Sequence, residues 1–267
     1  MNTHIDLSIL SERPQVAPMP RARVFNAYLQ ETRSEILRYL RTPSFMLPTL
    51  LFPTVFYLMF GVLLGHGSGG QQARYMLAAY STFGVMAPGL FGFGVSLALE
   101  RDGGLLTLKR ALPMPPAAYL VGKMVMAMLV AAVIAALLLS LALFVAHVPL
   151  SAAQVSRLFA LEVAGVLPFC ALGLLLGTII KGQGAPGLVN MIYLPMAFLS
   201  GLWFPLSIMP KFLQQLAPIW PSYHLNQLAL SAIDMPHAGS GLVHAVALCA
   251  FTLACLWLAV RRLRRIG

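Results

Sequence analysis

Six long stretches of this chain contain no Asp, Glu, Lys or Arg, and this feature restricts the possible folds more than any other. They are Ser44–Gly65, Tyr75–Leu99, Met124–Ser156, Val163–Ile180, Gly182–Pro210 and Met235–Val260. A helix of about 20 mostly apolar residues crosses the roughly 30 Å hydrocarbon core of a bilayer. We therefore predict an all-α, polytopic membrane protein with six transmembrane helices, over about 44–65, 75–99, 119–147, 158–180, 185–204 and 240–260.

The composition excludes an ordinary soluble domain. Hydrophobic residues make up 59% of the chain and charged residues 10%, whereas soluble domains are about 45–50% apolar and about 25% charged. The formal net charge is +10. Since the basic residues lie mainly at the ends of apolar stretches and near the N-terminus, we interpret them as topology signals and contacts with lipid head groups. We do not expect binding to nucleic acid.

The basic residues also predict the orientation. If the N-terminus is cytoplasmic, 15 of the 18 Lys and Arg residues fall in cytoplasmic segments, and only Arg74, Arg157 and Lys211 fall outside. This asymmetry matches the positive-inside rule. We expect a multi-pass protein of the bacterial cytoplasmic (inner) membrane with both termini inside, and a poorly ordered cytoplasmic tail over residues 1–22.

Residues 23–42 have the pattern of an amphipathic helix. Apolar side chains lie on one side, charged side chains of both signs lie on the other, and Pro43 follows. Such a helix is typical of the cytoplasmic membrane interface. A simple membrane anchor explains the pattern, but the mixed charge favours an additional protein contact, for which the candidate residues are Glu31, Arg33, Glu35 and Arg38.

Two further segments do not resemble free loops. Residues 100–116 begin and end with charge or proline but are rich in leucine between, which indicates a short cytoplasmic helix with a partner surface. Residues 205–232 include four prolines up to Pro221, with Trp220 and Tyr223 suited to an interfacial position. We predict that this second segment forms short re-entrant helices between spans five and six.

Several chemistries have no matching motif. The chain contains no phosphate-binding GxxxxGK[ST] loop, no HExxH and no GxSxG. We expect no catalytic residue, no cofactor site and no metal site, and therefore no enzyme activity in this chain.

Glu162, near the outer end of span four, is the one Asp, Glu, Lys or Arg residue predicted to lie within the bilayer. Lys123 lies in the first turns of the long third span, and we expect these turns to stand out of the bilayer or the helix to tilt. Ionisable residues within the bilayer are functional candidates by default. Three interpretations of Glu162 remain open: a carboxylate near the interface that pairs with Arg157, an outer polar site on a substrate path, and a proton relay.

Stripes of small and aromatic residues lie on spans two and five. The motif Gly173-x-x-x-Gly177 on span four also permits close helix packing. Buried packing explains these stripes, and a pathway for an amphipathic molecule is the alternative. The candidate path residues are Tyr80, Phe91, Asn190, Tyr193, Ala197, Ser200, Gly201 and Phe204.

Taken in order, three motifs resemble the ABC-2 type permeases, the membrane subunits of a class of ATP-driven exporters. The first is the amphipathic helix that ends at Arg41-Thr42-Pro43. The second is Glu100-Arg101-Asp102-Gly103-Gly104-Leu105-Leu106, followed by Leu112-Pro113 and, ten residues after Pro113, by Lys123. The third is Trp203-Phe204-Pro205 with Pro210, Leu213 and Pro221 behind it. The resemblance covers about residues 23–262. Leu112 and Thr107 depart from the family pattern, in which Thr and an acidic residue are common at these positions.

The resemblance implies an architecture and partners. Residues 23–267 form the transmembrane domain, 23–42 are its connecting helix, and about 100–116 are its coupling helix. Two permease subunits pair, and two separate ATP-binding cassette subunits that hold ATP and Mg dock beneath them. The implied ATPase-coupling residues are Glu100, Arg101, Asp102, Gly104, Leu105, Leu106, Leu108, Lys109, Arg110, Leu112 and Pro113.

We therefore expect a homodimeric efflux permease that moves a hydrophobic or amphipathic substrate, such as a drug, lipid or glycolipid, by alternating access. An ion-coupled secondary transporter is the main alternative, and a membrane-embedded enzyme is a further one. Dependence on a separate ATPase distinguishes the first from the second.

Overall fold

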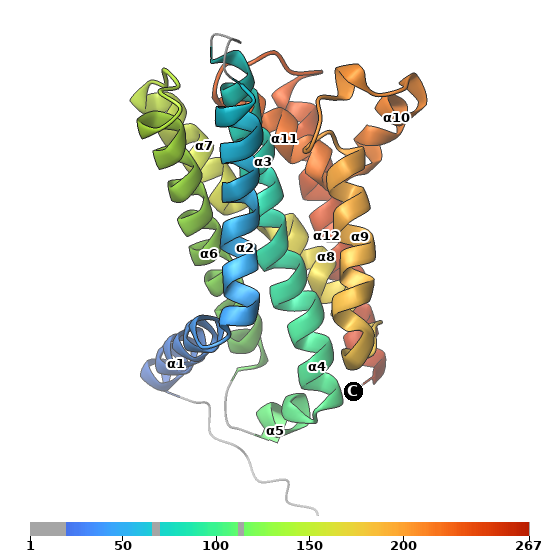
Figure 1. Cartoon of the computed structure of the whole chain (residues 1–267). Helices are drawn as coiled ribbons and strands as arrows, with labels where there is room; N and C mark the ends of the chain where they lie inside the picture. The colour runs from blue at the N-terminus through green and yellow to red at the C-terminus, as the bar shows by residue number, and fades with distance from the viewer. Residues whose placement is uncertain (1–19, 66–69, 112–114, 267) are drawn as a thin grey trace, which may run out of the picture.

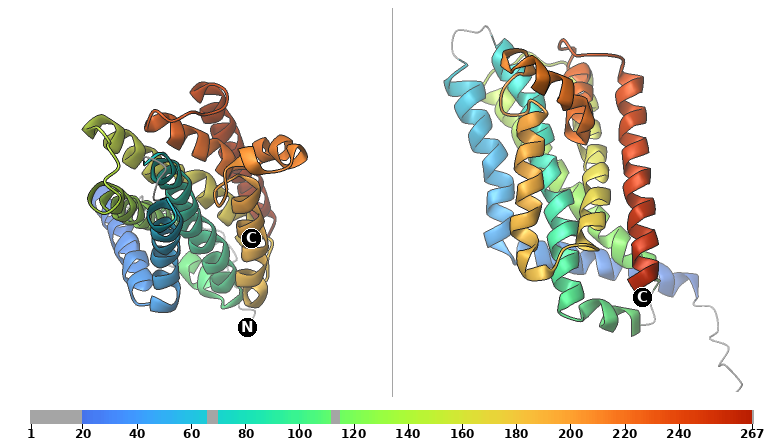
Figure 2. Two further views of the ribbon diagram at one scale, coloured as in Figure 1. Left: turned by 45° about the horizontal axis from the view of Figure 1, so that its top comes forward. Right: turned by 90° about the vertical axis from the view of Figure 1, so that its right-hand side faces the viewer.

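The computed structural model describes residues 20–65, 70–111 and 115–266, and this part of the chain is helical without any strand. The predicted all-α fold class is confirmed. Long helices run side by side in a bundle, α1 (Arg21–Leu40) lies across one end of it, and short helices cover the other end (Figures 1 and 2).

Five helices in the described residues are long and apolar enough to cross a membrane. They are Pro43–Leu63, Gln71–Asp102, Ala117–Phe144, Ala152–Gly177 and Gly241–Leu263. They coincide with five of the six predicted spans. The fifth predicted span corresponds to α9 (Ala185–Leu199), whose 15 residues are fewer than the usual 20 or so. The number of spans therefore stays a prediction.

Proline and glycine divide the long helices into shorter elements, because proline lacks the N–H that the helix ladder needs. Pro53 and Pro88 lie inside α2 and α3, and a π-helical segment follows each of these helices. Pro168, in the first turn of α8, accompanies the break after α7. The elements from α2 to α8 are α2 (Pro43–Phe56), η2 (Tyr57–Leu63), α3 (Gln71–Gly89), η3 (Leu90–Val95), α4 (Ser96–Asp102), α5 (Leu105–Ala111), α6 (Pro116–Phe144), α7 (Ala152–Gly165) and α8 (Leu167–Gly177).

The core lies around α3, which packs against α2, α6, α8 and α11. Small residues permit a close contact between α3 and α8, because a Cβ atom on Gly173 of α8 would lie 2.6 Å from the backbone oxygen of Gly89. Such a separation is too short for any side chain, so these two glycines fix the distance between α3 and α8. The predicted close approach at Gly173 is therefore present within the chain.

The chain after α8 returns from the base of the bundle through α9, covers the far end with short helices and ends in the last span (Figure 1). Ser200 and Ser222 link α9 to α11 through hydroxyl oxygens 2.5 Å apart, and His224 contacts His244 of α12 with 2.8 Å between their Nδ1 atoms. These links hold the segment after α9 against the bundle. The elements after α8 are η4 (Gly182–Gly184), α9, η5 (Leu206–Ile208), α10 (Lys211–Leu216), η6 (Ala217–Ile219), α11 (Pro221–Ala232) and α12 (Gly241–Ile266).

Candidate functional site

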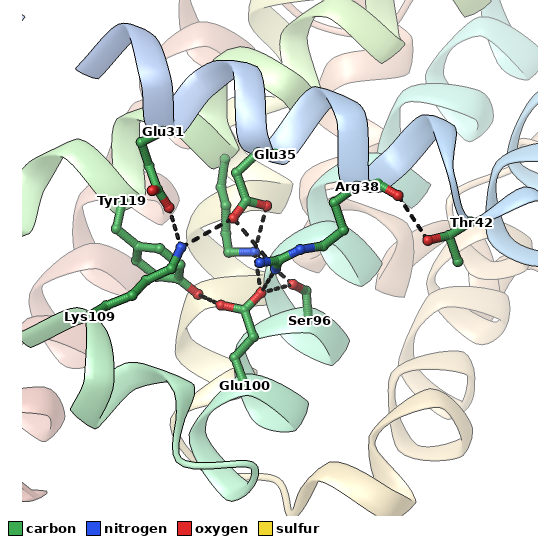
Figure 3. A network of polar contacts seen from close by, with 9 residues as sticks. Glu31, Glu35, Arg38, Thr42, Ser96, Glu100, Lys109 and Tyr119 are labelled. Atoms are coloured by element: carbon green, nitrogen blue, oxygen red, sulfur yellow. Dashed lines mark hydrogen bonds and ion pairs between the residues drawn. The ribbon is translucent and has the colours of Figure 1, made fainter. Parts of the chain in front are cut away.

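Six charged side chains meet where α1 crosses the base of the bundle, and we call them the ion cluster (Figure 3). They come from four helices, of which α1 is far in the sequence from the other three. Three are carboxylates and three are cations, so their formal charges cancel. The members are Glu31, Glu35 and Arg38 on α1, Glu100 on α4, Lys109 on α5 and Lys123 on α6.

Lys123 is the centre of the ion cluster. Its side chain is fully buried, and Nζ lies 3.0 Å from Glu35 Oε2 and 2.9 Å from Glu100 Oε1. Nζ also donates to Ser96 Oγ at 2.6 Å. An ammonium group has three N–H donors, and here three acceptors receive them. Burial of a charge is tolerable only with such partners, so α1, α4 and α6 depend on one another at this point.

Glu100 receives the largest number of donors in the cluster. Besides Lys123, its Oε1 accepts from Arg38 and from Ser96 Oγ at 2.7 Å, while Oε2 accepts from Tyr119 OH at 2.7 Å. Ser96 and Glu100 are four residues apart on one helix, a spacing that brings side chains together. Burial alone would lower the pKa of Arg38, but Glu100 and Glu35 outweigh that effect and raise it above its ordinary value.

Lys109 connects α5 to the same cluster. Its Nζ pairs with Glu31 and lies 3.6 Å from Glu35 Oε1, and it also lies 4.4 Å from the centre of the Tyr119 ring. This is a cation–π distance. The side chain is only 14% exposed, so Lys109 points toward α1 and α6, not toward the solvent.

The next two residues after Glu100 attach α4 to the end of α8. Arg101 donates from Nη1 to the Gly177 oxygen at 3.1 Å and from Nη2 to the Ile180 oxygen at 2.7 Å. Asp102 Oδ2 accepts from the Gly182 amide at 2.7 Å. Basic side chains stabilise the unpaired carbonyls at a helix C-terminus. The three charged residues of this motif thus bind to different elements of the same chain.

Among the described side chains of α5 (105–109), one apolar side chain is strongly exposed. Leu108 is 62% exposed, whereas Leu105 and Leu106 are partly covered and Leu106 packs against the core. Gly104 precedes the helix with a φ of +76°, a conformation that favours glycine. Arg110 belongs to α5 by its backbone, while Leu112 and Pro113 lie outside the described residues.

The face of α1 that carries mixed charge turns toward the bundle. Glu35 is 2% exposed, whereas Phe25 is 72% and Leu29 is 55% exposed. Glu31, Glu35 and Arg38 make ion pairs within the chain, and a contact of this face with a partner protein stays a prediction. Arg33 is exposed, and its role in contacting an ATPase stays a prediction.

A cavity of roughly 480 Å³ adjoins the ion cluster. Arg38 and Glu100 lie at its polar end, and most of its wall is apolar. Its size falls within the usual range of ligand pockets. Its lining residues are Glu35, Arg38, Tyr39, Thr42, Ser44, Phe45, Phe91, Gly92, Val95, Ser96, Leu99, Glu100, Met126 and Pro186.

The candidate path residues do not share one surface. Tyr193 is buried, stacks on Phe83 at 5.1 Å between ring centres, and donates to the Phe83 oxygen at 3.2 Å. Phe91 lines the cavity and contacts Tyr193. Buried positions are those of Tyr80, Tyr193, Ala197, Ser200 and Gly201, whereas Asn190 and Phe204 are exposed.

Glu162 is fully buried, and the pairing with Arg157 considered from the sequence is wrong. Thr82 on α3 donates to Glu162 Oε1 at 3.1 Å, while Arg157 pairs with Asp234 at 3.2 Å. On α7 the two residues are five apart, a spacing that puts them on different sides of the helix. The role of Glu162 as an outer polar site stays a prediction.

Lys123 was not among the candidate site residues, although the sequence contains a signal for it. A lysine inside an apolar helix needs a buried carboxylate, and Glu35 and Glu100 are such carboxylates. The contact between His224 and His244 was also missed, because these residues lie on different helices 20 positions apart.

Comparison with known proteins gives the family. The sequence profile described as ABC-2 type transporter matches residues 27–233, which is most of the chain. The chain belongs to the ABC-2 type transporter family. It is also 29% identical over 205 residues to the "Putative transport permease YvfS" of Bacillus subtilis (strain 168), and the match covers 75% of this chain and 83% of that protein. The chain is thus the membrane subunit of a transporter and works with ATP-binding cassette partners.

Proposed function

We propose that this permease is the membrane subunit of an ATP-driven exporter in which α5 docks on a separate ATPase subunit. Two copies of the chain pair, and a hydrophobic or amphipathic substrate leaves the cytoplasmic side at their interface. In this proposal the partner subunit binds ATP and Mg. Its movement displaces α5, and this displacement produces alternating access of the substrate path to the two sides of the membrane.

The attachment of α4 and α5 carries the proposal. Glu100 and Lys109 join this segment to α1 and α6, and Arg101 joins it to α8. A partner that displaces α5 therefore acts on several long helices at once. Since Leu108 is the strongly exposed leucine of α5, we expect its side chain to enter the partner's groove. Burial of one leucine contributes about 1.5–3 kcal/mol.

The topology that the proposal requires has six spans and both termini in the cytoplasm. Helix α9 lies alongside the long helices (Figures 1 and 2), and its 15 residues rise about 22 Å. Adjoining short turns make up part of the remaining bilayer thickness. Helices α1 and α5 and the C-terminal end of α12 lie at the same end of the bundle (Figure 1). By the positive-inside rule, the high number of Lys and Arg residues at this end supports a cytoplasmic location for it.

The cavity beside the ion cluster is our candidate for the first substrate position. It is mostly apolar, it lies at the α5 end of the bundle, and it touches α1, α2, η3, α4, α6 and α9. A bound molecule would therefore contact the same helices that α5 can move.

The test is Leu108→Asp in the permease co-expressed with its ATPase. We expect loss of transport and weaker ATPase co-purification, because a carboxylate would enter an apolar contact. Thr107→Asp is the matched control: this neighbour is exposed, it takes the same charge, and the family commonly has an acidic residue there. Normal transport and full ATPase binding in Leu108→Asp would remove α5 from the coupling role.

The buried carboxyl of Glu162 favours one alternative, an ion-coupled transporter. In sealed vesicles, a proton ionophore should leave transport intact as long as ATP is supplied. Transport that stops with the ionophore and ignores ATP would favour the alternative.

A further inference from the structure

Arg38 is the member of the ion cluster that remains open to its surroundings. Its side chain is 39% exposed, whereas that of Lys109 is 14% and that of Lys123 is 0% exposed. The carboxylates are covered as well, at 12% for Glu31, 2% for Glu35 and 7% for Glu100. A molecule in the adjoining cavity therefore meets a cation before it meets any other charge of the cluster.

The guanidinium of Arg38 has donors to spare. Its Nη1 donates to Glu100, and among the described residues no hydrogen bond uses its Nη2 or Nε. Arginine has five N–H donors in a planar fork that binds carboxylate, phosphate or sulfonate oxygens in pairs. The free side of this fork suits an anion.

The rest of the cavity suits an apolar chain. Phe45, Phe91, Val95, Leu99 and Met126 form much of its wall. A cationic head group would find few accessible acceptors, since the Glu100 oxygens already accept from lysine, arginine, serine and tyrosine donors. The other carboxylate of the lining, Glu35, has one oxygen without a hydrogen bond among the described residues, but it is buried and lies 3.5 Å from Arg38 and 3.6 Å from Lys109. An anion at one end and a hydrocarbon body at the other is the chemistry that matches both parts.

We propose that this cavity binds an amphipathic molecule with an anionic head group and that Arg38 is the residue that pairs with that group. The proposal rests on the proposed function only in treating the occupant as a transported substrate. Because Arg38 and Lys123 share Glu100 Oε1, a head group that draws Arg38 away weakens a bond to α4. Occupation of the cavity is thereby transmitted to the helix that leads into α5.

The experiment measures protection of a cysteine at position 44, which lines the cavity and is exposed. Full-length permease carries Ser44→Cys with Cys170, Cys249 and Cys255 replaced by alanine, in nanodiscs of phosphatidylcholine. The probes are dodecyl phosphate, dodecyl maltoside and dodecyltrimethylammonium, each below its micelle concentration. We expect dodecyl phosphate to block maleimide labelling at a concentration about tenfold or more below that of the cationic probe.

Substitutions assign this preference to Arg38. Arg38→Gln should abolish the difference between the anionic and cationic probes, and Arg38→Lys should keep part of it. Arg41→Gln is the matched control, because Arg41 is exposed just after the same helix and should keep the full preference. If Arg38→Gln does not fold, the weaker preference of Arg38→Lys relative to Arg41→Gln still tests the pairing.

A second arm distinguishes the source of the head group. Protection by phosphatidylglycerol nanodiscs without a probe, lost in Arg38→Gln and reduced in Arg38→Lys, identifies an anionic membrane lipid as the occupant. Protection by dodecyl phosphate alone identifies a separate amphiphile, and both results support the site. Equal protection by anionic and cationic probes, or an unchanged preference in Arg38→Gln, overturns it. Neither arm uses an ATPase, so failure here leaves the coupling proposal to its own test.

Discussion

Replacement of Lys123 by methionine tests the ion cluster most directly. Methionine keeps the length and apolar body of the side chain but removes the charge. In the folded protein Lys123 is fully buried and lies within 3.0 Å of oxygens of both Glu35 and Glu100. Without the ammonium group these two carboxylates share one site, and the cluster has a net charge of −1.

The size of the effect follows from burial. Removal of one partner from a buried ion pair costs about 3–5 kcal/mol, because the remaining charge is left without compensation. Lys123 compensates two carboxylates that are 2% and 7% exposed, so we expect a loss of free energy of unfolding in that range. A second substitution, Glu100→Gln, brings the charges back into balance, and the double variant should recover most of the loss.

Denaturant titration of the purified permease in mixed micelles measures both effects. Lys181→Met is the surface control, since Lys181 is exposed and such changes usually fall within about 0.5 kcal/mol. A Lys123→Met variant within that margin of the wild type would refute the role of the cluster. So would a double variant that is less stable than Lys123→Met alone.

Three further predictions concern other parts of the fold. Arg101→Gln removes two hydrogen bonds to the backbone at the end of α8. The segment around Lys181 is then held less firmly, so trypsin should cleave faster after Lys181, and an unchanged cleavage rate would contradict this role of Arg101. Gly173→Ala puts a Cβ atom 2.6 Å from a backbone oxygen of α3 and should lower stability by about 1–3 kcal/mol, while Gly187→Ala, with no atom within 4 Å, should not. Burial lowers the pKa of His224. The His224 side chain therefore binds a proton more weakly in the folded protein than in the unfolded chain, where the pKa of histidine is about 6.5. Thermal stability should therefore fall as the pH drops below about 6.5, and His224→Gln should reduce this dependence; an equal dependence in both proteins would be evidence against it.

The long helices could be predicted from the sequence because the bilayer limits what an uncharged stretch can do. Each of the five membrane-length helices overlaps a stretch without charge. One uncharged stretch does not form a helix of membrane length. The stretch from Gly182 to Pro210 has no charged residue, yet its helix ends at Leu199. Gly201 adopts a φ of +78° and Pro205 follows shortly after, so local backbone chemistry, not hydrophobicity, ends the helix.

The direction in which α1 faces could not be predicted from its own pattern. Periodicity separates the polar side of a helix from its apolar side, but it does not say what lies opposite. The partners of Glu31 and Glu35 are Lys109 and Lys123, which are 78 and 88 positions away. Local spacing has no information about such distant pairs.

Sequence proximity also misassigned one ion pair. Arg157 is near Glu162 in the chain but pairs with Asp234, which follows α11. The buried carboxyl bonds to Thr82 instead. In a bundle where α7 touches both α3 and α11, the nearest charge in sequence is less informative than the nearest helix.

The ion cluster and the cavity together suggest why this junction is charged and not apolar. Apolar contacts are non-directional, so helices that meet through them can slide, whereas a set of paired charges has few alternative registers. Lys109 connects α5 to two carboxylates of α1, Glu31 and Glu35, and Arg38 connects the edge of the cavity to Glu100 of α4. Lys123 also binds Glu35 and Glu100. A movement of α5 and the arrival of an anionic head group therefore act on the same few oxygens, and Lys123→Met should weaken the influence of each on the other even where it leaves either one intact.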